Sequence, residues 1–263
     1  MTTPPLVILD LGRVPYLEGL TLQRSLRERR IAGHLDRDVL LLLEHEPTVT
    51  LGRGTKEASL PCPPEELRRL GLTVAEVERG GDVTWHGPGQ LVGYPILDLG
   101  GHRRDLHWYL RQVEEALMET LAALGIPSER RPGYTGVWTR GRKIASIGVH
   151  VRQWVTAHGF AINVTNDLRD FDLIVPCGIS GVEMTSVTRE LGGSAARNDG
   201  SAVRRLSLPR AERGGGSAEE ADLWRQTVDT VSASFARVFG LEPVETRLDL
   251  LLAEGTDERV RAY

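Results

Sequence analysis

A glycine-rich segment in the first third of the chain brings a cation, an indole and an imidazole close together. Residues 79–90 read RGGDVTWHGPGQ, with four glycines in twelve positions. Glycine allows positive φ angles and close approach of the backbone to a ligand. The segment is therefore a candidate ligand-binding wall, and the competing interpretation is a tight hairpin whose glycines serve only its turns. It is not a GxxxxGK phosphate loop, because no Lys follows it.

Lysine is scarce in this chain, which makes each lysine informative. Of the 32 basic residues, only Lys56 and Lys143 are Lys and all others are Arg. Arg stays charged near neutral pH, whereas a buried Lys can exchange protons, so a site that needs proton transfer cannot use Arg. Lys143 lies in the run GRKIASIG, where strand alternation places it on one face with Ala145. The small residues Ala145 and Gly148 leave space beside it, and a simple strand-edge lysine is the alternative.

Cys62 and Cys177 are the two cysteines of the sequence. They are too few for a disulfide framework, and no CxxC spacing indicates zinc, so free thiols in a reducing compartment are expected. Cys177 lies between Pro176 and Gly178, a loop setting that would expose its sulfur, although an inert buried thiol is the commoner fate of a lone Cys. Cys62, which has a proline on each side, is expected to be structural.

The bulk properties exclude several classes of protein. At 263 residues the chain has the size of one well-covered domain. No apolar run approaches the length of a membrane span and no basic region precedes the first apolar run, so we expect a cytoplasmic protein with no membrane partner. A formal net charge of −4 gives no broad field for nucleic acid, and no nucleic-acid partner is expected. No heptad pattern appears, so we expect a monomer.

The hydrophobic pattern predicts a β-rich centre with helices placed outside it. Strands are expected at 6–11, 39–43, 48–51, 73–77, 91–97, 134–138, 143–151 and 154–162. The run 39–43 should be buried on both faces, with 48–51 as its hairpin partner. Helices are expected at 15–30, 105–124 and 223–239, with the second as the longest. Residues 189–221 are crowded with Gly, Ser, Ala, Arg and Glu, and are expected to form a mobile surface loop.

Four segments in order carry a family resemblance: 79–90, 141–148, the run HGFAIN at 158–163 and PCG at 176–178. They resemble the bacterial lipoyl(octanoyl) transferases over about residues 40 to 188. The resemblance implies an α+β fold of the biotin/lipoate protein ligase type, with a central mixed β-sheet flanked by helices, as a single catalytic domain over residues 1–263. Nothing is carried over into 189–221, which is longer than the usual connection in that family.

The resemblance also implies an activity, with no cofactor and no metal. An octanoyl group would move from octanoyl-acyl carrier protein to the lysine of a lipoyl domain, which is the first step of protein lipoylation. The implied acceptors are the lipoyl domains of 2-oxoacid dehydrogenases and the glycine cleavage H protein. A carrier thioester is already activated, so this transfer needs no ATP.

The same resemblance assigns roles to individual residues. Cys177 would carry the acyl thioester, and Lys143 would stabilise its thiolate and move protons. His86 is the rival partner of Cys177, because Cys–His pairs are the commoner way to activate a thiol. Substrate contacts are expected from Arg79, Gly80, Gly81, Asp82, Val83, Thr84, Trp85, His86, Ser146, Ile147, Gly148, Gly159, Phe160 and Ala161.

Two other functions remain open at this stage. An ATP-dependent lipoate or biotin ligase on the same fold would use the glycine-rich segment and Lys143 to hold an acyl-adenylate. Such an enzyme needs no nucleophilic thiol, so it should survive Cys177→Ser and require ATP. A non-catalytic acyl-binding protein would bind fatty acid reversibly without turnover.

Overall fold

A computed structural model describes residues 3–178, 181–192, 217–244 and 246–253, and of Cys177 only the backbone. The strands are β1 (Pro5–Arg13), β2 (Asp38–Glu44), β3 (Thr48–Leu51), β4 (Thr73–Glu76), β5 (Thr84–His86), β6 (Gln90–Ile96), β7 (Val137–Thr139), β8 (Arg142–Arg152), β9 (Val155–Asn163) and β10 (Glu242–Val244). The α-helices are α1 (Tyr16–Ile31), α2 (Pro64–Arg69), α3 (Leu106–Ala123), α4 (Val187–Glu190), α5 (Ala218–Phe239) and α6 (Leu248–Ala253). Three short 3₁₀ segments are η1 (Glu57–Ser59), η2 (Leu168–Leu173) and η3 (Pro176–Gly178).

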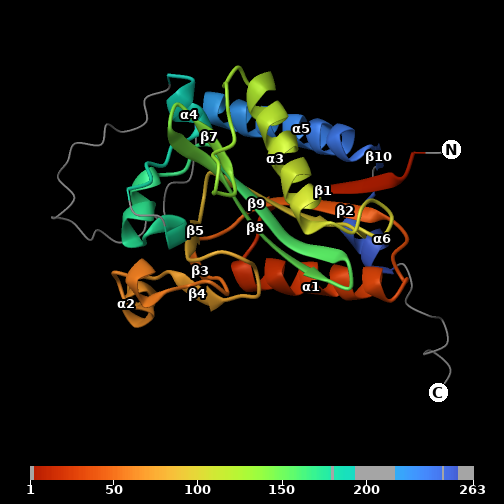
Figure 1. Cartoon of the computed structure of the whole chain (residues 1–263), viewed down its shortest axis with the longest axis horizontal. Coiled ribbons are helices and arrows are strands. Elements are labelled where there is room, and N and C mark those ends of the chain that lie inside the picture. Colours follow the sequence, from red (N-terminus) through yellow and green to blue (C-terminus); the bar gives the residue numbers. More distant parts are fainter. Residues whose placement is uncertain (1–2, 179–180, 193–216, 245, 254–263) are drawn as a thin grey trace.

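A seven-stranded mixed sheet forms the centre, in the order β10-β1-β2-β6-β9-β8-β7. Strand β1 pairs in parallel with β10 and β2, and the remaining pairs are antiparallel. Helices α3 and α5 cover one face of the sheet, and α1 and α6 lie on the other (Figure 1). This arrangement confirms the expected α+β fold with a central mixed sheet and flanking helices.

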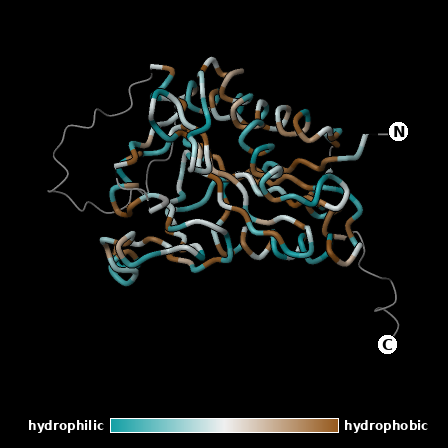
Figure 2. The backbone as a smooth tube through the Cα atoms, viewed as in Figure 1, coloured by the Kyte–Doolittle hydropathy of each residue, from teal (hydrophilic) through white to brown (hydrophobic). Residues whose placement is uncertain are grey.

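Strand β2 shows why its sequence is apolar without interruption. Leu40 and Leu42 belong to the cluster shared with α3 and α5, whereas Val39, Leu41 and Leu43 belong to the cluster shared with α1. Alternate side chains thus reach opposite layers, as the period of a strand requires. Burial of 39–43 on both faces is confirmed, and Figure 2 shows the apolar residues concentrated along the central strands.

A second sheet of three strands, in the order β4-β3-β5, holds the glycine-rich segment. The expected hairpin between 39–43 and 48–51 is wrong: β3 leaves the main sheet and pairs with β4 in parallel and with β5 antiparallel. The segment between β4 and β6, expected as a loop, contains β5 itself. Val49 and Trp85 anchor this sheet in a separate apolar cluster with Phe171 and Leu67 of α2.

The helices match the expected ranges 15–30, 105–124 and 223–239 with two corrections. The longest helix is α5, with 22 residues, and not α3, with 18. It begins at Ala218, where Ser217 and Glu220 form a capping box, because reciprocal side-chain caps satisfy the free backbone groups of a helix start. The expected loop 189–221 is therefore helical at both ends, in α4 and α5. Its central part, 193–216, lies outside the described residues, and the expected mobility stays a prediction.

Among the described residues, no helix combines the length and apolar character needed to cross a bilayer.

Candidate active site

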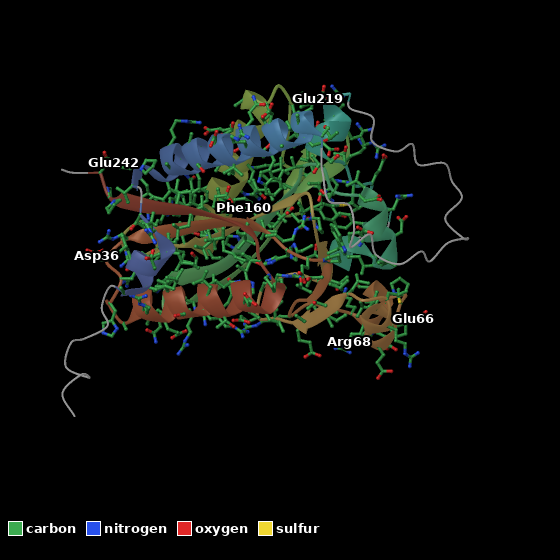
Figure 3. All side chains as sticks on the ribbon, turned by 180° about the vertical axis from the view of Figure 1, so that it is seen from behind. Asp36, Glu66, Arg68, Phe160, Glu219 and Glu242 are labelled. Atoms are coloured by element: carbon green, nitrogen blue, oxygen red, sulfur yellow. The ribbon has the colours of Figure 1, made fainter. Side chains whose placement is uncertain are left out.

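A cavity of about 460 Å³ lies where β8 and β9 meet the glycine-rich segment. Ligand pockets commonly have volumes of about 300–1,000 Å³. Its walls come from α1, β5, β6, β8, β9, the start of α3 and residues 133–135. Phe160, one of its lining residues, lies near the middle of the molecule, whereas labelled charged residues such as Glu66 and Glu219 lie at its margins (Figure 3).

The cavity gathers almost all the residues expected at the site. Thirteen of the expected substrate-binding residues line it together with Lys143: Arg79, Gly80, Gly81, Asp82, Val83, Thr84, His86, Ser146, Ile147, Gly148, Gly159, Phe160 and Ala161. Strand pairing explains the convergence, because Ser146 lies opposite Ala161 and Gly148 lies opposite Gly159. The two strands of one hairpin, β8 and β9, thus form one wall.

Trp85 is the expected substrate-binding residue that does not line the cavity. Its side chain is buried beside Phe171, with ring centroids 5.6 Å apart, in the cluster beneath the small sheet. Strand β5 has a period of two, so Thr84 and His86 face the cavity and Trp85 faces the opposite side. The structure thus gives this indole a packing role.

Lys143 is 2% exposed, which is exceptional for a lysine. Its backbone is fixed on both sides: its N–H donates to the carbonyl of Glu183 at 2.8 Å, and its carbonyl accepts from Thr185 N–H at 2.9 Å. Its Nζ lies 5.5 Å from the ring centroid of Trp138. The other lysine, Lys56, is exposed. Of the two lysines, Lys143 is therefore the one that lines the cavity.

The turn that carries Cys177 lies against the wall of the cavity. Asp82 accepts hydrogen bonds from Ser59 Oγ–H at 2.7 Å and from Val83 N–H at 2.7 Å. The carbonyl of Ser59 in turn accepts from Val175 N–H at 3.0 Å. A Cβ atom added at Gly178 would lie 2.3 Å from Asp82 Oδ2. The carboxylate of Asp82 therefore ties η1 to the glycine-rich segment and touches η3 directly.

Arg79 directs most of its hydrogen-bonding groups at the protein itself. Its Nη2–H donates to both the carbonyl and the hydroxyl oxygen of Thr50, each at 2.8 Å. Its Nη1–H donates to the carbonyl of Asp82 at 2.7 Å and to that of Gly80 at 3.1 Å. The buried guanidinium thus shapes the glycine-rich segment, a role that the sequence pattern did not reveal.

His86 begins a buried chain of hydrogen bonds that ends at the backbone carbonyl of Lys143. His86 Nδ1–H donates to Gln90 Oε1 at 2.7 Å, and Gln90 Nε2–H donates to Asn163 Oδ1 at 2.9 Å. Asn163 Nδ2–H donates to the carbonyl of Thr185, whose N–H binds the carbonyl of Lys143. Burial lowers the pKa of His86 to about 3, with a further contribution from His45. A neutral imidazole of such low pKa is a weak base at pH 7.

Sequence reasoning missed several residues that line the cavity. Tyr16 and Tyr94 contribute rings from α1 and β6, and Leu106, Leu110 and Tyr134 contribute from α3 and the segment after it. Leu106 and Leu110 are four residues apart on one helix face, a spacing that also fits a core helix, so the sequence could not distinguish the two.

His158 is a further lining residue that sequence reasoning passed over. It has φ of +56°, in the left-handed region that non-glycine residues seldom adopt. Its N–H donates to Gln23 Oε1 at 2.7 Å, and its Nε2 lies 3.8 Å from Glu78 Oε2. The run HGFAIN contained this histidine, but no local pattern indicated its backbone conformation.

Fold and site together define the class of this protein. Residues 15–202 match the family of the lipoyl protein ligase A/B catalytic domain, and the chain belongs to that family. A bipartite lipoate protein ligase from Thermoplasma acidophilum, described in one structural analysis with its E2 lipoyl domain, has a similar structure with a TM-score of 0.58. The likeness covers 98% of this chain and 96% of the ligase at 17% identity, so it shows the fold.

Sequence relatives narrow the class further. An octanoyltransferase of Gloeobacter violaceus is 44% identical over 248 residues, which cover 94% of this chain and 96% of the relative. An octanoyltransferase of Geobacter sulfurreducens is 53% identical over 185 residues, which cover 70% of this chain and 75% of the relative. The chain is therefore an acyltransferase of the octanoyltransferase type, as the sequence motifs predicted.

Proposed function

We propose that this enzyme takes an octanoyl group from the thioester of octanoyl-acyl carrier protein and passes it, through acyl-Cys177, to the lysine of a lipoyl domain. Lys143 is the acid and base of both steps. The observation that carries the proposal is the burial of Lys143 in the wall of a cavity that three of the motif segments also line. The similar structure from Thermoplasma acidophilum, a lipoate protein ligase described with its E2 lipoyl domain, supports a lipoyl domain as acceptor.

In the first step, the thiolate of Cys177 attacks the carbonyl carbon of the octanoyl thioester. The new S–C bond forms, the bond to the carrier sulfur breaks, and Lys143 gives its proton to the departing thiolate. The donor is already an activated acyl group, so this step needs neither ATP nor metal. Packing of η3 against Asp82, which lines the cavity, supports the placement of the thiol near the substrate.

In the second step, the amine of the acceptor lysine attacks the acyl thioester on Cys177. The acceptor attacks as its neutral amine, because a protonated lysine is not a nucleophile, and Lys143, now neutral, removes the proton that the nitrogen loses as the C–N bond forms. The Cys177 thiolate leaves, and the pair of ammonium and thiolate is restored. The thirteen expected residues that line the cavity would contact the substrate during this step. The neutral ring of His86 would orient the substrate instead of acting as a base.

Lys143→Arg separates proton transfer from simple charge. Arg keeps the positive charge but cannot lose its proton near pH 7, and general acid–base catalysis is worth about 10²- to 10⁴-fold. We expect release of the carrier thiol to slow, and acylation of the lipoyl domain to slow more. Single-turnover kinetics that follow carrier release and lipoyl-domain acylation separately measure both steps. Lys56→Arg, which changes the exposed lysine, is the matched control.

Near-normal rates of both steps in Lys143→Arg would refute the acid–base role and make His86 the leading candidate for the base.

Intact mass after mixing with octanoyl-carrier protein tests the nucleophile: one acyl group is expected on the wild type and none on Cys177→Ala. A Cys177→Ser variant that remains active only with ATP would instead identify a ligase, and fatty-acid binding without turnover an acyl-binding protein. Several expectations remain predictions. They are location in the cytoplasm, a monomeric state, a single catalytic domain, and transfer to the lipoyl domains of 2-oxoacid dehydrogenases and to the glycine cleavage H protein.

A further inference from the structure

Two cations lie over the indole ring of Trp138. The guanidinium carbon of Arg131 is 5.0 Å from the ring centroid, and Nζ of Lys143 is 5.5 Å from it. Both distances are within the range of a cation–π interaction, which is stronger where the groups are desolvated. Trp138 is 1% exposed and Lys143 is 2% exposed, whereas Arg131 lies at the surface. The buried contact is therefore the one to Lys143.

Trp138 is held in place by its backbone. Its N–H donates to the carbonyl of Glu129 at 2.9 Å, and its carbonyl accepts from Glu129 N–H at 2.8 Å. Trp138 also pairs with Lys143 across β7 and β8. Within the described part of the chain, its indole N–H has no hydrogen-bond partner. The ring is thus fixed by strand pairing and packing, and Lys143 contacts the face of the ring.

Gly136 bounds the side chain of Lys143 as well. A Cβ atom added at Gly136 would lie 2.8 Å from Cε and 3.4 Å from Nζ of Lys143. Gly136 N–H donates to Oε1 of Glu114 at 3.3 Å. Glu114 is buried on α3 and also pairs with Arg130, whose Nε is 3.0 Å from its Oε2. A buried carboxylate thus anchors the backbone that touches the lysine.

From these contacts we propose that Trp138 is a positioning residue for Lys143. Its indole face, together with the backbone of Gly136, forms a seat that holds the ammonium at the cavity wall. The inference rests on the proposed function, in which Lys143 must reach first the carrier sulfur and then the acceptor amine. A lysine has four side-chain torsions, so a fixed ring face removes conformations in which the ammonium misses the reacting atoms.

The contact can be tested without the reaction, because the chain has only two lysines. With ¹³C-labelled lysine incorporated into the full chain, two sets of Cε–Hε signals are expected, and Lys56→Arg assigns them. Protons over an aromatic face resonate upfield, so the Hε signal of Lys143 should lie upfield of that of Lys56. Trp138→Leu should move it toward the Lys56 position. Trp138→Phe should retain most of the shift, because it keeps an aromatic face and removes no hydrogen bond.

The kinetic arm uses the same variants in single turnover. Trp138→Leu is expected to slow acylation of the lipoyl domain by about three- to thirty-fold, the range that corresponds to one cation–π contact, with little change in KM for the acceptor. Trp138→Phe should recover most of that rate. Arg131→Gln is the matched control: it removes the other cation from the same ring, and the Lys143 signal and the transfer rate should stay as in the wild type.

An unchanged Lys143 signal in Trp138→Leu would overturn the inference. A Trp138→Leu variant in which the Lys143 signal moves while transfer of the acyl group stays normal would also overturn it. The same holds for a folded Trp138→Phe variant that transfers the acyl group as slowly as Trp138→Leu. Lys143→Arg is measured in parallel to separate failure of the inference about Trp138 from failure of the proposed function. If Lys143→Arg is impaired and the Trp138→Leu signal does not move, only the seat fails. If Lys143→Arg transfers normally, the proposed function fails and the catalytic reason for the seat fails with it.

Discussion

At the scale of single residues, Gly178 shows how closely the cysteine turn fits its surroundings. It adopts φ of +65°, in the left-handed region where a side chain costs about 1–2 kcal/mol. A Cβ there would also lie 2.3 Å from Asp82 Oδ2. Asp82 cannot retreat freely, because Ser59 and Val83 donate to its two oxygens. A side chain at 178 must therefore displace either the turn or the carboxylate.

Gly178→Ala is expected to slow formation of the acyl-enzyme by about tenfold or more, since the strain of about 1–2 kcal/mol and the clash with Asp82 both act on the turn that carries Cys177. The burst rate of carrier release measures the effect. Gly181→Ala is the control, because Gly181 also has a positive φ, of +75°, but a Cβ there would meet nothing within 4 Å. Equal losses in the two variants would mean that contact with Asp82 is unimportant.

At the scale of elements, a buried guanidinium ties the first residues of the glycine-rich segment to strand β3 of the small sheet. Arg79 reaches across to Thr50 on β3 and back to the carbonyls of Gly80 and Asp82. Planar guanidinium groups present several donors in fixed directions, which an ammonium cannot reproduce. The fixed shape of the segment, and hence of the cavity wall, depends on this geometry as well as on its glycines.

Arg79→Lys should therefore destabilise the protein although it conserves charge. Loss of hydrogen bonds from a charged donor to buried acceptors is worth about 1.5–3 kcal/mol. We expect a lower urea midpoint and slower acyl transfer. Arg53→Lys is the matched control, since Arg53 is exposed in the turn that follows β3. Equal midpoints for wild type and Arg79→Lys would show that the loop holds its shape without the guanidinium.

At the scale of the whole molecule, aromatic rings from three layers meet at His45. Its ring centroid lies 4.9 Å from that of Tyr16 on α1, 6.1 Å from His86 on β5 and 5.8 Å from Tyr94 on β6. His45 Nδ1–H donates to the carbonyl of Val14, and the hydroxyl of Tyr94 donates to Nε2, both at 2.7 Å. Burial lowers the pKa of His45 to about 4. The ring is therefore neutral in the folded protein at neutral pH.

This burial predicts a pH dependence of stability. The unfolded chain binds a proton at His45 near pH 6.5 and the folded protein only near pH 4, so the contribution of His45 is complete above pH 6.5 and is lost as pH falls toward 4. The slope from this group is about 1.4 kcal/mol per pH unit at most. The free energy of unfolding of His45→Gln, measured in urea between pH 7 and 4.5, should fall less steeply than that of the wild type.

The comparison uses slopes, so an overall loss of stability in His45→Gln does not affect it. His34→Gln, on an exposed histidine, controls for the substitution itself. Parallel curves for wild type and His45→Gln would contradict a neutral, buried His45.

The sequence by itself determined the local elements and the class of enzyme. Short-range hydrophobic periodicity, which can be recognised without knowledge of the fold, predicts the helices around 15–30 and 223–239 and the strand at 39–43. The scarcity of lysine singled out Lys143, and its burial in the cavity agrees with that choice. Four motifs in order were specific enough to identify the family.

Tertiary structure alone decided which strands pair with each other, and whether a side chain faces the core or the cavity. Strand β3 pairs with β4 and not with its neighbour β2, because pairing depends on burial against distant segments such as η2 and α2. For the same reason Trp85 packs in the core while Thr84 lines the cavity. The contact of Trp138 with Lys143 arises from strand pairing and packing that no local pattern encodes, since the energy of such contacts is fixed only when the two segments meet.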